Sequence, residues 1–486
     1  MKKSVFAAML AAMSVIACNP EKETPVLEIP NPSYDVAAAG GEVTVSVKSN
    51  TDWTVSCKSD ADWYNSDVIL GNGDQDIVIT VNANESEDGR SADFEVSTVS
   101  GLARTFTVSQ AGYSTPAEAV NLSAEGTANC YIVAPGSVAY FKANVKGNGT
   151  EALEGAKGVK LVWQSEKALV KSMKLLEKSG NILVEVSETP GNAVVAATNE
   201  AGEIIWSWHL WVADYNPGGA LFTTEANASG TTWTFMDRNL GATTMEKGTF
   251  GKNAGLIYQW GRKDPFPSAA GYTVQNEDYS YQEDAEPEYY DFDGNVLPKL
   301  YTTSQYEGSV ALGIANPFVF YKVGSRDTGK VDEYGEAIYE NVPRTCDWSD
   351  TSDDDAWGGV SMKKTIYDPC PVGYKVPVCD ADGNTPYAWL TYAKREWDTQ
   401  YYGATQDGQW FPTIGTRVYA SGGLSYAEAT PYSGIWIGTA GVASSNLEEY
   451  PTLYGQYMFI GSGKRTFKVN KDARSQGMSV RCVKEQ

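Results

Sequence analysis

Apolar and polar residues alternate with a period of two through the early part of the chain. Val43, Val45 and Val47 share one face of the run GGEVTVSV, and the runs DIVITVNAN and FTVSQAG follow the same rule. Strand side chains point to opposite faces in turn, so this alternation is typical of half-buried strands. Turn residues separate the runs, and we therefore predict a β-sandwich of about seven or eight short strands over residues 26–112.

A second set of strand-like runs follows a short linker that contains a proline. The runs are NCYIVAP, VAYFKANV, VKLVWQ, NILVEV, NAVVAAT and IIWSWHLWV, with glycines between them. They predict another sandwich over residues 119–214. The last run is apolar on both faces and carries His209, the one histidine of the chain. We interpret this histidine as a packed structural residue rather than a base.

The remainder of the chain, residues 220–486, has a less regular pattern. In the run YAWLTYAKREWDTQYYG, aromatic residues recur near helical spacing at Trp389, Tyr392, Trp397 and Tyr401. This spacing predicts one helix, whose aromatic face is expected to pack rather than to catalyse.

The chain begins with a charged start and a short apolar run. Lys2 and Lys3 precede residues 4–17, which are apolar or small and too few to span a bilayer. A positive start followed by such a run is the order of a signal peptide.

The letters VIAC at the end of that run resemble the lipobox of a bacterial lipoprotein. The resemblance implies that residues 1–17 are removed, that the thiol of Cys18 receives a diacylglycerol and that the new amino group is acylated. Each buried methylene contributes about 0.8 kcal/mol, so several chains anchor a protein firmly. Residues 18–25 resemble the polar tether of Bacteroidetes lipoproteins, which implies an outer-membrane anchor and exposure at the cell surface. The alternative is an ordinary signal peptide in which this cysteine has no role.

The composition of the chain argues against several classes of binding partner. The chain carries 38 Lys and Arg against 61 Asp and Glu, and loss of the first 17 residues with their two lysines makes the formal charge −25. Such an acidic body is a poor partner for nucleic acid or anionic lipid headgroups. A single histidine argues against His-rich metal sites. The 29 tyrosines and 14 tryptophans supply side chains that can stack on sugars.

The first predicted sandwich resembles, over its whole length, the BACON domain of Bacteroidetes surface proteins. The matching positions are Gly40, Gly41, Asn50, Trp53, Trp63, Asn84, Arg90, Val108 and Gln110. The resemblance implies a domain that binds carbohydrate or mucin, or one that acts as a spacer. Trp53 and Trp63 are then candidate glycan-binding residues, and the alternative is that both belong to the core.

Four motifs of the last region, in order, resemble the Fibrobacter succinogenes major paralogous domain. They are WTFMDRNLGAT, GLIYQWGRKDPFP, KKTIYDPCPVGYKVP and GMSVRCVK. The resemblance implies a C-type lectin-like α+β domain over residues 220–486. The expected fold class is therefore mainly β, with two Ig-like sandwiches followed by this α+β domain.

Two cysteines of these motifs are predicted to form a disulfide. Cys370 lies between two prolines, which hold the backbone extended, and Cys482 lies in the strand-like run SVRCV. A bond between them would hold the last strand beside the proline segment. Cys346 and Cys379 are a second candidate pair.

Two segments carry side chains suited to ligands. In YQWGRKDPFP, Trp260 can stack on a sugar ring while Arg262 and Asp264 bond its hydroxyls, or the cluster can be structural. The loop CDWSDTSDDDAWGG holds carboxylates of the kind that Ca²⁺ prefers, or it is a solvated acidic loop. These metal candidates are Asp347, Asp350, Asp353, Asp354 and Asp355. Apart from this calcium, we expect no cofactor.

The sequence as a whole predicts a cell-surface lipoprotein that binds glycan or a host glycoprotein without catalysis, as an adhesin or capture protein. A structural or fimbria-associated component built from spacer modules is one alternative. A glycan-acting hydrolase is another, because 61 acidic residues allow many carboxylate pairs and no spacing singles one out.

Overall fold

The structure, a computed structural model, describes most of the chain between residues 23 and 485. The residues outside this description are 1–22, 250, 269–286, 299–307, 324, 332, 336, 342–345, 420, 426–431, 442–452, 462–466 and 486. The predicted signal peptide and Cys18 therefore lie outside the described residues. Contacts divide the chain into two compact units, unit 1 (Met1–Ser114) and unit 2 (Thr115–Gln486).

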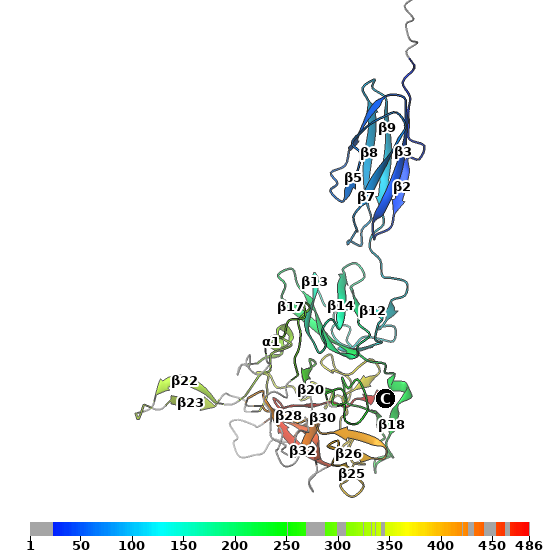
Figure 1. The fold of residues 1–486 in the computed structure, drawn as a ribbon. Coiled ribbons are helices and arrows are strands. Elements are labelled where there is room, and N and C mark those ends of the chain that lie inside the picture. The colour runs from blue at the N-terminus through cyan, green and yellow to red at the C-terminus, as the bar shows by residue number, and fades with distance from the viewer. Residues whose placement is uncertain are drawn as a thin grey trace, which may run out of the picture. The chain divides into compact units, whose positions relative to one another are not determined.

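Unit 1 is a sandwich of two sheets, with the strand orders β1-β3-β7-β5 and β2-β9-β8-β4-β6 (Figure 1). Its strands are β1 (Leu27–Glu28), β2 (Ser33–Val36), β3 (Gly41–Ser49), β4 (Asp52–Cys57), β5 (Tyr64–Ser66), β6 (Leu70–Asn72), β7 (Gln75–Val81), β8 (Arg90–Thr98) and β9 (Ala103–Gln110). The inward residues Val45 and Val47 join Phe94 and Phe106 in one core, where the two phenylalanine rings stack 4.9 Å apart. The strands predicted from the period-two alternation are thus present.

The N-terminal part of unit 2 is a second sandwich, with the sheet orders β10-β12-β15-β14 and β11-β17-β16-β13. Its strands are β10 (Val120–Asn121), β11 (Cys130–Val133), β12 (Val138–Lys142), β13 (Gly158–Gln164), β14 (Val170–Leu176), β15 (Asn181–Val186), β16 (Gly191–Thr198) and β17 (Ile204–Val212). All of β16 and most of β17 are buried. One face of this pair packs on the opposite sheet, and the other packs on the remainder of unit 2.

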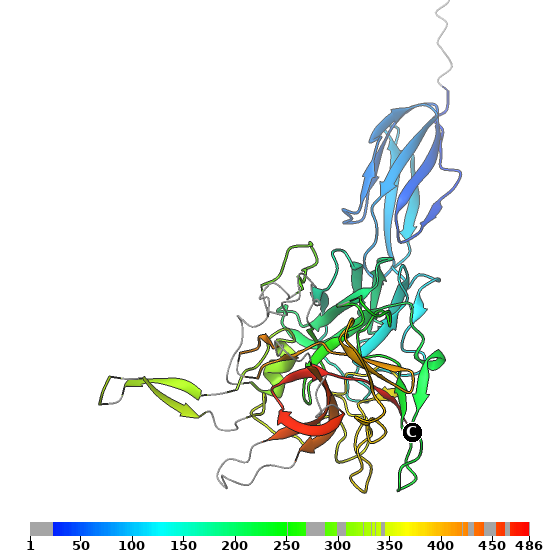
Figure 2. The ribbon, with the colours of Figure 1, turned by 60° about the horizontal axis from the view of Figure 1, so that its bottom comes forward.

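The remainder of unit 2 consists of short elements joined by turns. They are η1 (Pro217–Gly219), β18 (Leu221–Thr223), β19 (Thr234–Met236), β20 (Leu256–Gln259), β21 (Phe266–Pro267), α1 (Val310–Ala315), β22 (Ser325–Val331), β23 (Ala337–Asn341), β24 (Tyr374–Lys375), β25 (Glu396–Asp398), β26 (Gly403–Gln406), β27 (Gln409–Pro412), β28 (Thr416–Arg417), β29 (Leu424–Ser425), β30 (Tyr432–Gly441), β31 (Tyr454–Gly461), β32 (Lys468–Ala473), β33 (Gly477–Ser479) and β34 (Val483–Lys484). The hairpin β22–β23 extends from the body of unit 2 in both ribbon views (Figures 1 and 2).

The last two strands occupy central positions in their sheets. In the order β21-β20-β33-β30-β31-β32, β33 lies between β20 and β30, and it also pairs with β28. In the order β18-β19-β34-β24, β34 lies between β19 and β24. The strands β33 and β34 therefore pair with β20 and β19, which lie near the start of this region.

The second sandwich and the remainder of unit 2 share one apolar core. Cys130, Val194 and Trp211 of the sandwich pack in the same cluster as Trp260 and Trp436. The two regions that the sequence predicts as separate domains pack against each other within one compact unit, because the outer face of β16 and β17 is too apolar to lie against water.

The structure is mainly β, but it does not show the expected α+β C-type lectin-like domain. Among the described residues, the one α-helix is the six-residue α1. The helix predicted over 387–403 is wrong, since this segment forms turns and β25. Tyr387, Trp389 and Trp397 of this segment pack in one core cluster, with Trp389 4.5 Å from Phe222 between ring centroids and Tyr387 buried. Within the described residues, no helix has the length and apolar content needed to cross a bilayer.

Candidate functional site

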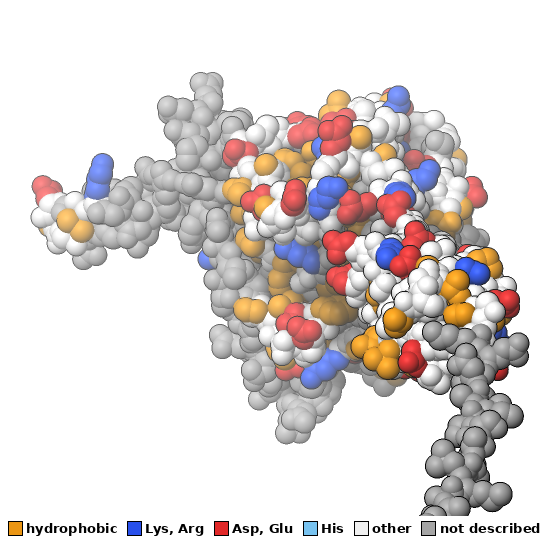
Figure 3. All heavy atoms as spheres, turned by 90° about the horizontal axis from the view of Figure 1, so that it is seen from above, with side chains coloured by type: hydrophobic (Ala, Val, Ile, Leu, Met, Phe, Trp, Pro, Cys, Tyr) orange, Lys and Arg blue, Asp and Glu red, His pale blue; other side chains and the backbone are white. Residues whose placement is uncertain are grey.

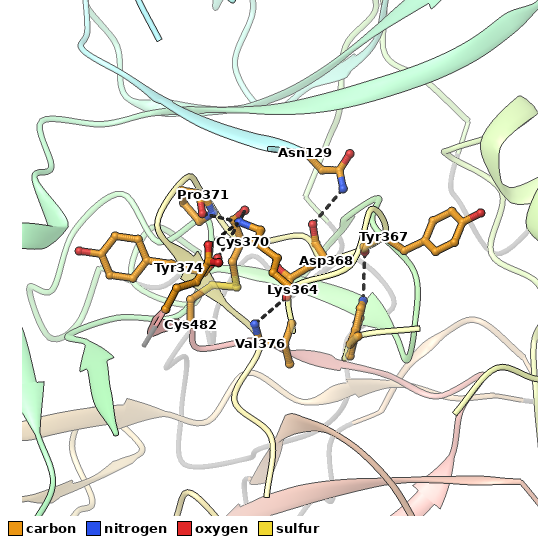
Figure 4. The surroundings of a disulfide bond; sticks show 11 residues. Asn129, Lys364, Tyr367, Asp368, Cys370, Pro371, Tyr374, Val376 and Cys482 are labelled. Carbon is orange, nitrogen blue, oxygen red and sulfur yellow. Dashed lines mark hydrogen bonds and ion pairs between the residues drawn. A yellow bond between two sulfur atoms is a disulfide. The ribbon is translucent and has the colours of Figure 1, made fainter. Parts of the chain in front are cut away.

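The proline motif of residues 363–377 is bonded to a distant segment of unit 2 by a disulfide (Figure 4). A disulfide joins Cys370 to Cys482, the pair expected from the sequence. The buried ammonium of Lys364 donates to the carbonyl oxygens of Cys370 (2.9 Å), Pro371 (2.6 Å) and Tyr374 (2.6 Å). These bonds hold the turn that presents Cys370 to the last strand.

The same motif is tied to the second sandwich through one asparagine. The Nδ2 of Asn129 donates to the carbonyl oxygens of Ile366 (2.7 Å) and Asp368 (2.9 Å), and its Oδ1 accepts from the indole N–H of Trp206 (2.9 Å). The Asp368 carboxylate accepts from backbone N–H groups, and burial raises its pKa to about 6. The motif therefore has a structural role, since it connects the second sandwich to the segment that contains Cys482.

The predicted second disulfide is wrong. Cys346 and Cys379 are both free thiols. Cys379 packs in a core cluster with Phe235 and Ile437, and Cys346 is not part of that cluster. Burial raises the pKa of both thiols, so neither is an activated nucleophile.

The predicted segment of residues 260–264 lines a small cavity. Helix α1 and the loop around Trp348 form its other walls, so the structure does bring this segment beside part of the acidic loop. The cavity volume is about 40 Å³, which holds roughly one to three waters. Small-molecule sites span about 300–1,000 Å³, so a sugar ring does not fit here.

Trp260 cannot stack on a sugar, because its ring is enclosed. The guanidinium of Arg474 lies 4.3 Å from the ring centroid, and the ring of Trp357 lies 5.8 Å away. The indole N–H donates to the carbonyl oxygen of Ile437 at 2.9 Å. The glycan-binding interpretation of Trp260 is therefore replaced by the structural alternative.

The side chains of Arg262 and Asp264 are also buried and bonded to other groups of the protein. Arg262 donates to the carbonyl oxygens of Val319 (2.6 Å) and Asn316 (3.0 Å), beyond the end of α1, and burial lowers its pKa to about 10. Asp264 Oδ1 lies 2.7 Å from Lys263 Nζ and accepts from the hydroxyl of Ser207 (2.6 Å). Asp264 thus links the remainder of unit 2 to the second sandwich, whereas Arg262 bonds within the remainder.

The acidic loop does not gather its carboxylates at one point. Arg474 forms ion pairs with Asp347, at 3.5 Å, and with Asp354. Asp355 accepts from two backbone N–H groups, and Asp353 accepts from one. Among the described residues, no three His, Cys, Asp or Glu side chains are placed to hold a metal, and this includes Asp350. The structure therefore favours the alternative of an acidic loop, whose carboxylates bond to Arg474 and to backbone N–H groups, over a calcium site.

His209 is a packed residue of β17, in agreement with the interpretation of the sequence. Its Nε2 lies 2.9 Å from Asn192 Oδ1. Burial lowers its pKa to about 3, so the ring is neutral near pH 7 and is a weak base.

The two tryptophans of unit 1 lie in its core. Trp63 is 9% exposed, and Arg90 lies 4.7 Å above its ring. Trp53 is 2% exposed, and its indole N–H donates to the carbonyl oxygen of Gly73 at 2.9 Å. The core alternative therefore replaces sugar stacking for both residues.

A groove opens on the sheet that contains β4, β6 and β8, directly beside Trp53. Strand pairing places Thr54 between Leu70 and Ser97, and Asp52 beside Asn72. Residues that pair across strands point to the same face. The amide of Asn72 donates to the Asp52 carboxylate at 2.5 Å, so the polar row is ordered.

The groove has the size and chemistry of a ligand site. Its volume is about 540 Å³, within the ~300–1,000 Å³ of small-molecule sites. Its rim is apolar and accessible, since Leu70 is 66% and Val99 is 99% exposed. The hydroxyls of Thr54 and Ser97 have no partner in the part of the chain that the structure describes.

Trp53 supports this groove from below. Gly71 crosses the indole so closely that a Cβ there would lie 2.3 Å from the ring. The sequence indicated Trp53, which lies beneath the groove, but it did not indicate the exposed rim residues Leu70 and Val99. The signal available for Leu70 was the apolar run VIL, which lies directly before the turn residues GNG.

Comparison with protein families identifies unit 1. Residues 26–113 match the family described as the viral BACON domain. These residues therefore form a BACON domain, in agreement with the resemblance noted from the sequence. No curated protein matches the chain.

The comparison with solved structures gives partial matches. A GH5 xyloglucanase from Bacteroides ovatus in complex with a XXXG heptasaccharide has 22% identity and a TM-score of 0.18, with 27% of this chain and 29% of that chain covered. A protein from Bacteroides thetaiotaomicron has 16% identity and a TM-score of 0.16, with coverages of 20% and 96%. The Ig1-2 module of a Drosophila receptor protein tyrosine phosphatase has 14% identity and a TM-score of 0.15, with coverages of 39% and 98%. This chain thus spans less than a third of the xyloglucanase.

Proposed function

We propose that this protein is a cell-surface lipoprotein that binds glycan through its BACON domain and does not act on the glycan catalytically. The observation that carries the proposal is the family match of residues 26–113, because BACON domains are associated with carbohydrate binding. The groove beside Trp53 supplies a place for the ligand.

The groove offers both kinds of contact that a sugar needs. The hydroxyls of Thr54 and Ser97 and the Asp52–Asn72 pair can exchange hydrogen bonds with sugar hydroxyls. Leu70 and Val99 can cover the C–H face of the ring. Acidic and basic side chains are interspersed on the face drawn in Figure 3.

Leu70→Asp and Val99→Asp are each expected to weaken glycan binding tenfold or more, because a charge at the apolar rim must be desolvated when the ligand docks. A glycan array with residues 19–486 would identify the ligand, and calorimetry would compare the variants. Val360→Asp, at an exposed apolar position of unit 2, is the matched control. Unchanged affinity in both groove variants would refute the groove, and release of reducing ends from the ligand would refute a noncatalytic role.

We also propose that Cys18 carries the lipid, on the strength of the VIAC motif and the tether after it. Cys18→Ser is expected to move the protein from the membrane fraction to the soluble fraction of the cell, because the acyl chains have no other attachment. Metabolic labelling with a fatty acid, followed by fractionation, measures both effects. Equal labelling of the serine variant would contradict the assignment.

The four motifs that resemble the Fibrobacter succinogenes major paralogous domain support a place for unit 2 among exported surface proteins. We propose that this region also contacts glycan, which is the lectin-like role that the resemblance implies.

A further inference from the structure

The groove of unit 1 has one acidic group in its lining and no basic group. Nine residues line it, and Asp52 is the one among them with an ionisable side chain. Asp52 and Thr54 are two residues apart on β4, so they share the face of the sheet that forms the groove. The amide of Asn72 donates to the Asp52 carboxylate at 2.5 Å, which holds the charge at this face. A ligand in contact with Thr54 is therefore close to a negative charge.

None of the four basic residues in the span 26–113 lines this groove. They are Lys48, Lys58, Arg90 and Arg104. The two lysines form ion pairs with carboxylates, at 3.1 Å from Asp74 and at 2.7 Å from Glu95. Glu95 lies two residues from Ser97 on β8, on the same face of the sheet as the groove. Its pairing with Lys58 means that the two together add no net charge to that face.

The two arginines bond or point to other parts of unit 1. Arg90 donates to the side-chain oxygen of Gln110 at 2.8 Å. Arg104 pairs across the strands with Val96, which is buried in the core, and not with Ser97. Since neighbouring strand residues point to opposite faces, Arg104 lies on the other face of the sheet from the groove. Within residues 26–113, all of which the structure describes, no cation is therefore placed to bond an anionic ligand in the groove.

The charge of the whole domain has the same sign as that of the groove. Residues 26–113 contain 14 Asp and Glu against four Lys and Arg, a formal charge of −10. Such an excess repels anions within about a Debye length of the surface, ~10 Å at 0.1 M salt. A carboxylate or sulfate on a glycan would meet this repulsion and would lose water in the groove without gaining an ion pair.

We infer that the groove selects uncharged glycans and discriminates against glycans that carry carboxylate or sulfate groups. The inference rests on the proposed function, since it takes this groove as the glycan site, and it adds the class of glycan. The hydroxyls of a neutral sugar can donate to the Asp52 carboxylate, while Leu70 and Val99 contact its C–H groups. An acidic sugar of similar size is rejected by its charge.

A glycan array built from matched pairs tests this selectivity. Residues 19–486 are applied to neutral oligosaccharides of glucose, xylose, mannose, galactose and N-acetyllactosamine, and to the same chains with an added uronic acid, sialic acid or sulfate. Calorimetry then gives the ratio of neutral to acidic affinity. We expect a ratio of about five or more for each added charge, the effect of two like charges roughly 4 Å apart in water. The ratio should fall between about 0.02 M and about 0.5 M NaCl, because salt screens the repulsion.

Asp52→Asn is expected to lower this ratio about fivefold, chiefly by strengthening the binding of the acidic glycan. Asp35→Asn is the matched control. It removes the same charge from β2, at the opposite edge of the same sheet, and should leave the ratio unchanged. The ratio is the decisive measurement, because damage to the fold or to a shared hydrogen bond would weaken both members of a pair.

The outcomes separate this inference from the proposed function. If acidic glycans bind as tightly as their neutral partners and Leu70→Asp weakens both, the groove stands as a glycan site and the inference is overturned. A ratio that neither salt nor Asp52→Asn changes would also overturn it, since the discrimination would then be steric. Binding of no glycan at all would refute the proposed function and this inference together.

Discussion

Replacing Cys370 and Cys482 together by alanine is expected to lower the free energy of unfolding of unit 2 by about 5 kcal/mol. The two cysteines are 112 residues apart, and in the chain-entropy model a bond across a loop of this length removes that much freedom from the unfolded state. The loss is large compared with the whole stability of an ordinary domain, so the variant is expected to unfold at a far lower urea concentration.

Tryptophan fluorescence during urea unfolding measures this effect. Unit 1 contains neither cysteine, so its own transition serves as an internal reference. Cys57→Ser, which removes a free thiol of unit 1, is the matched control for the loss of a sulfur atom. If wild-type protein unfolded at the same urea concentration with and without reductant, the disulfide would have no such role.

Asp264→Ala is expected to lower the free energy of unfolding of unit 2 by about 3–5 kcal/mol, because it leaves a buried charge without its partner. Lys263 is buried, its Nζ lies 2.7 Å from Asp264, and its ammonium lies 4.7 Å from the ring centroid of Trp206. Burial already lowers the pKa of Lys263, and loss of the carboxylate removes the main effect that opposes this shift.

The double variant Lys263→Met with Asp264→Leu separates the pair from the packing around it. It removes both charges and keeps the apolar volume, so it is expected to be more stable than Asp264→Ala alone. Thermal unfolding by circular dichroism gives the order. A double variant that is less stable than the single one would show that hydrogen bonds to Ser207, rather than charge balance, dominate here.

The parts of the fold that could be predicted are those that depend on neighbours in sequence. The alternation of Val43, Val45 and Val47 determines which face is buried without reference to the rest of the chain. The prolines around Cys370 restrict the backbone locally, and the partner cysteine lies in a recognisable strand. The BACON resemblance rested on turn glycines and core aromatic residues spread over one short sandwich.

The candidate site was harder to predict because exposure is set by distant segments. Trp260 is enclosed by Arg474, and two carboxylates of the acidic loop form ion pairs with the same arginine. Nothing near Trp260 in the sequence indicates this partner. Thr54, Leu70 and Ser97 come from three strands of unit 1, so only the folded chain shows that they share a groove.

The central placement of β33 and β34 affects the order in which the protein can be completed. Synthesis releases a chain from its N-terminus, and compact domains can form as soon as their residues emerge. Two sheets of unit 2 lack a middle strand until residues 477–484 are available, and Cys482 becomes available for oxidation only then. Unit 2 therefore cannot complete these two sheets until residues 477–484 have been made. Truncation of the chain before residue 477 would remove the centre of both sheets and leave their edges.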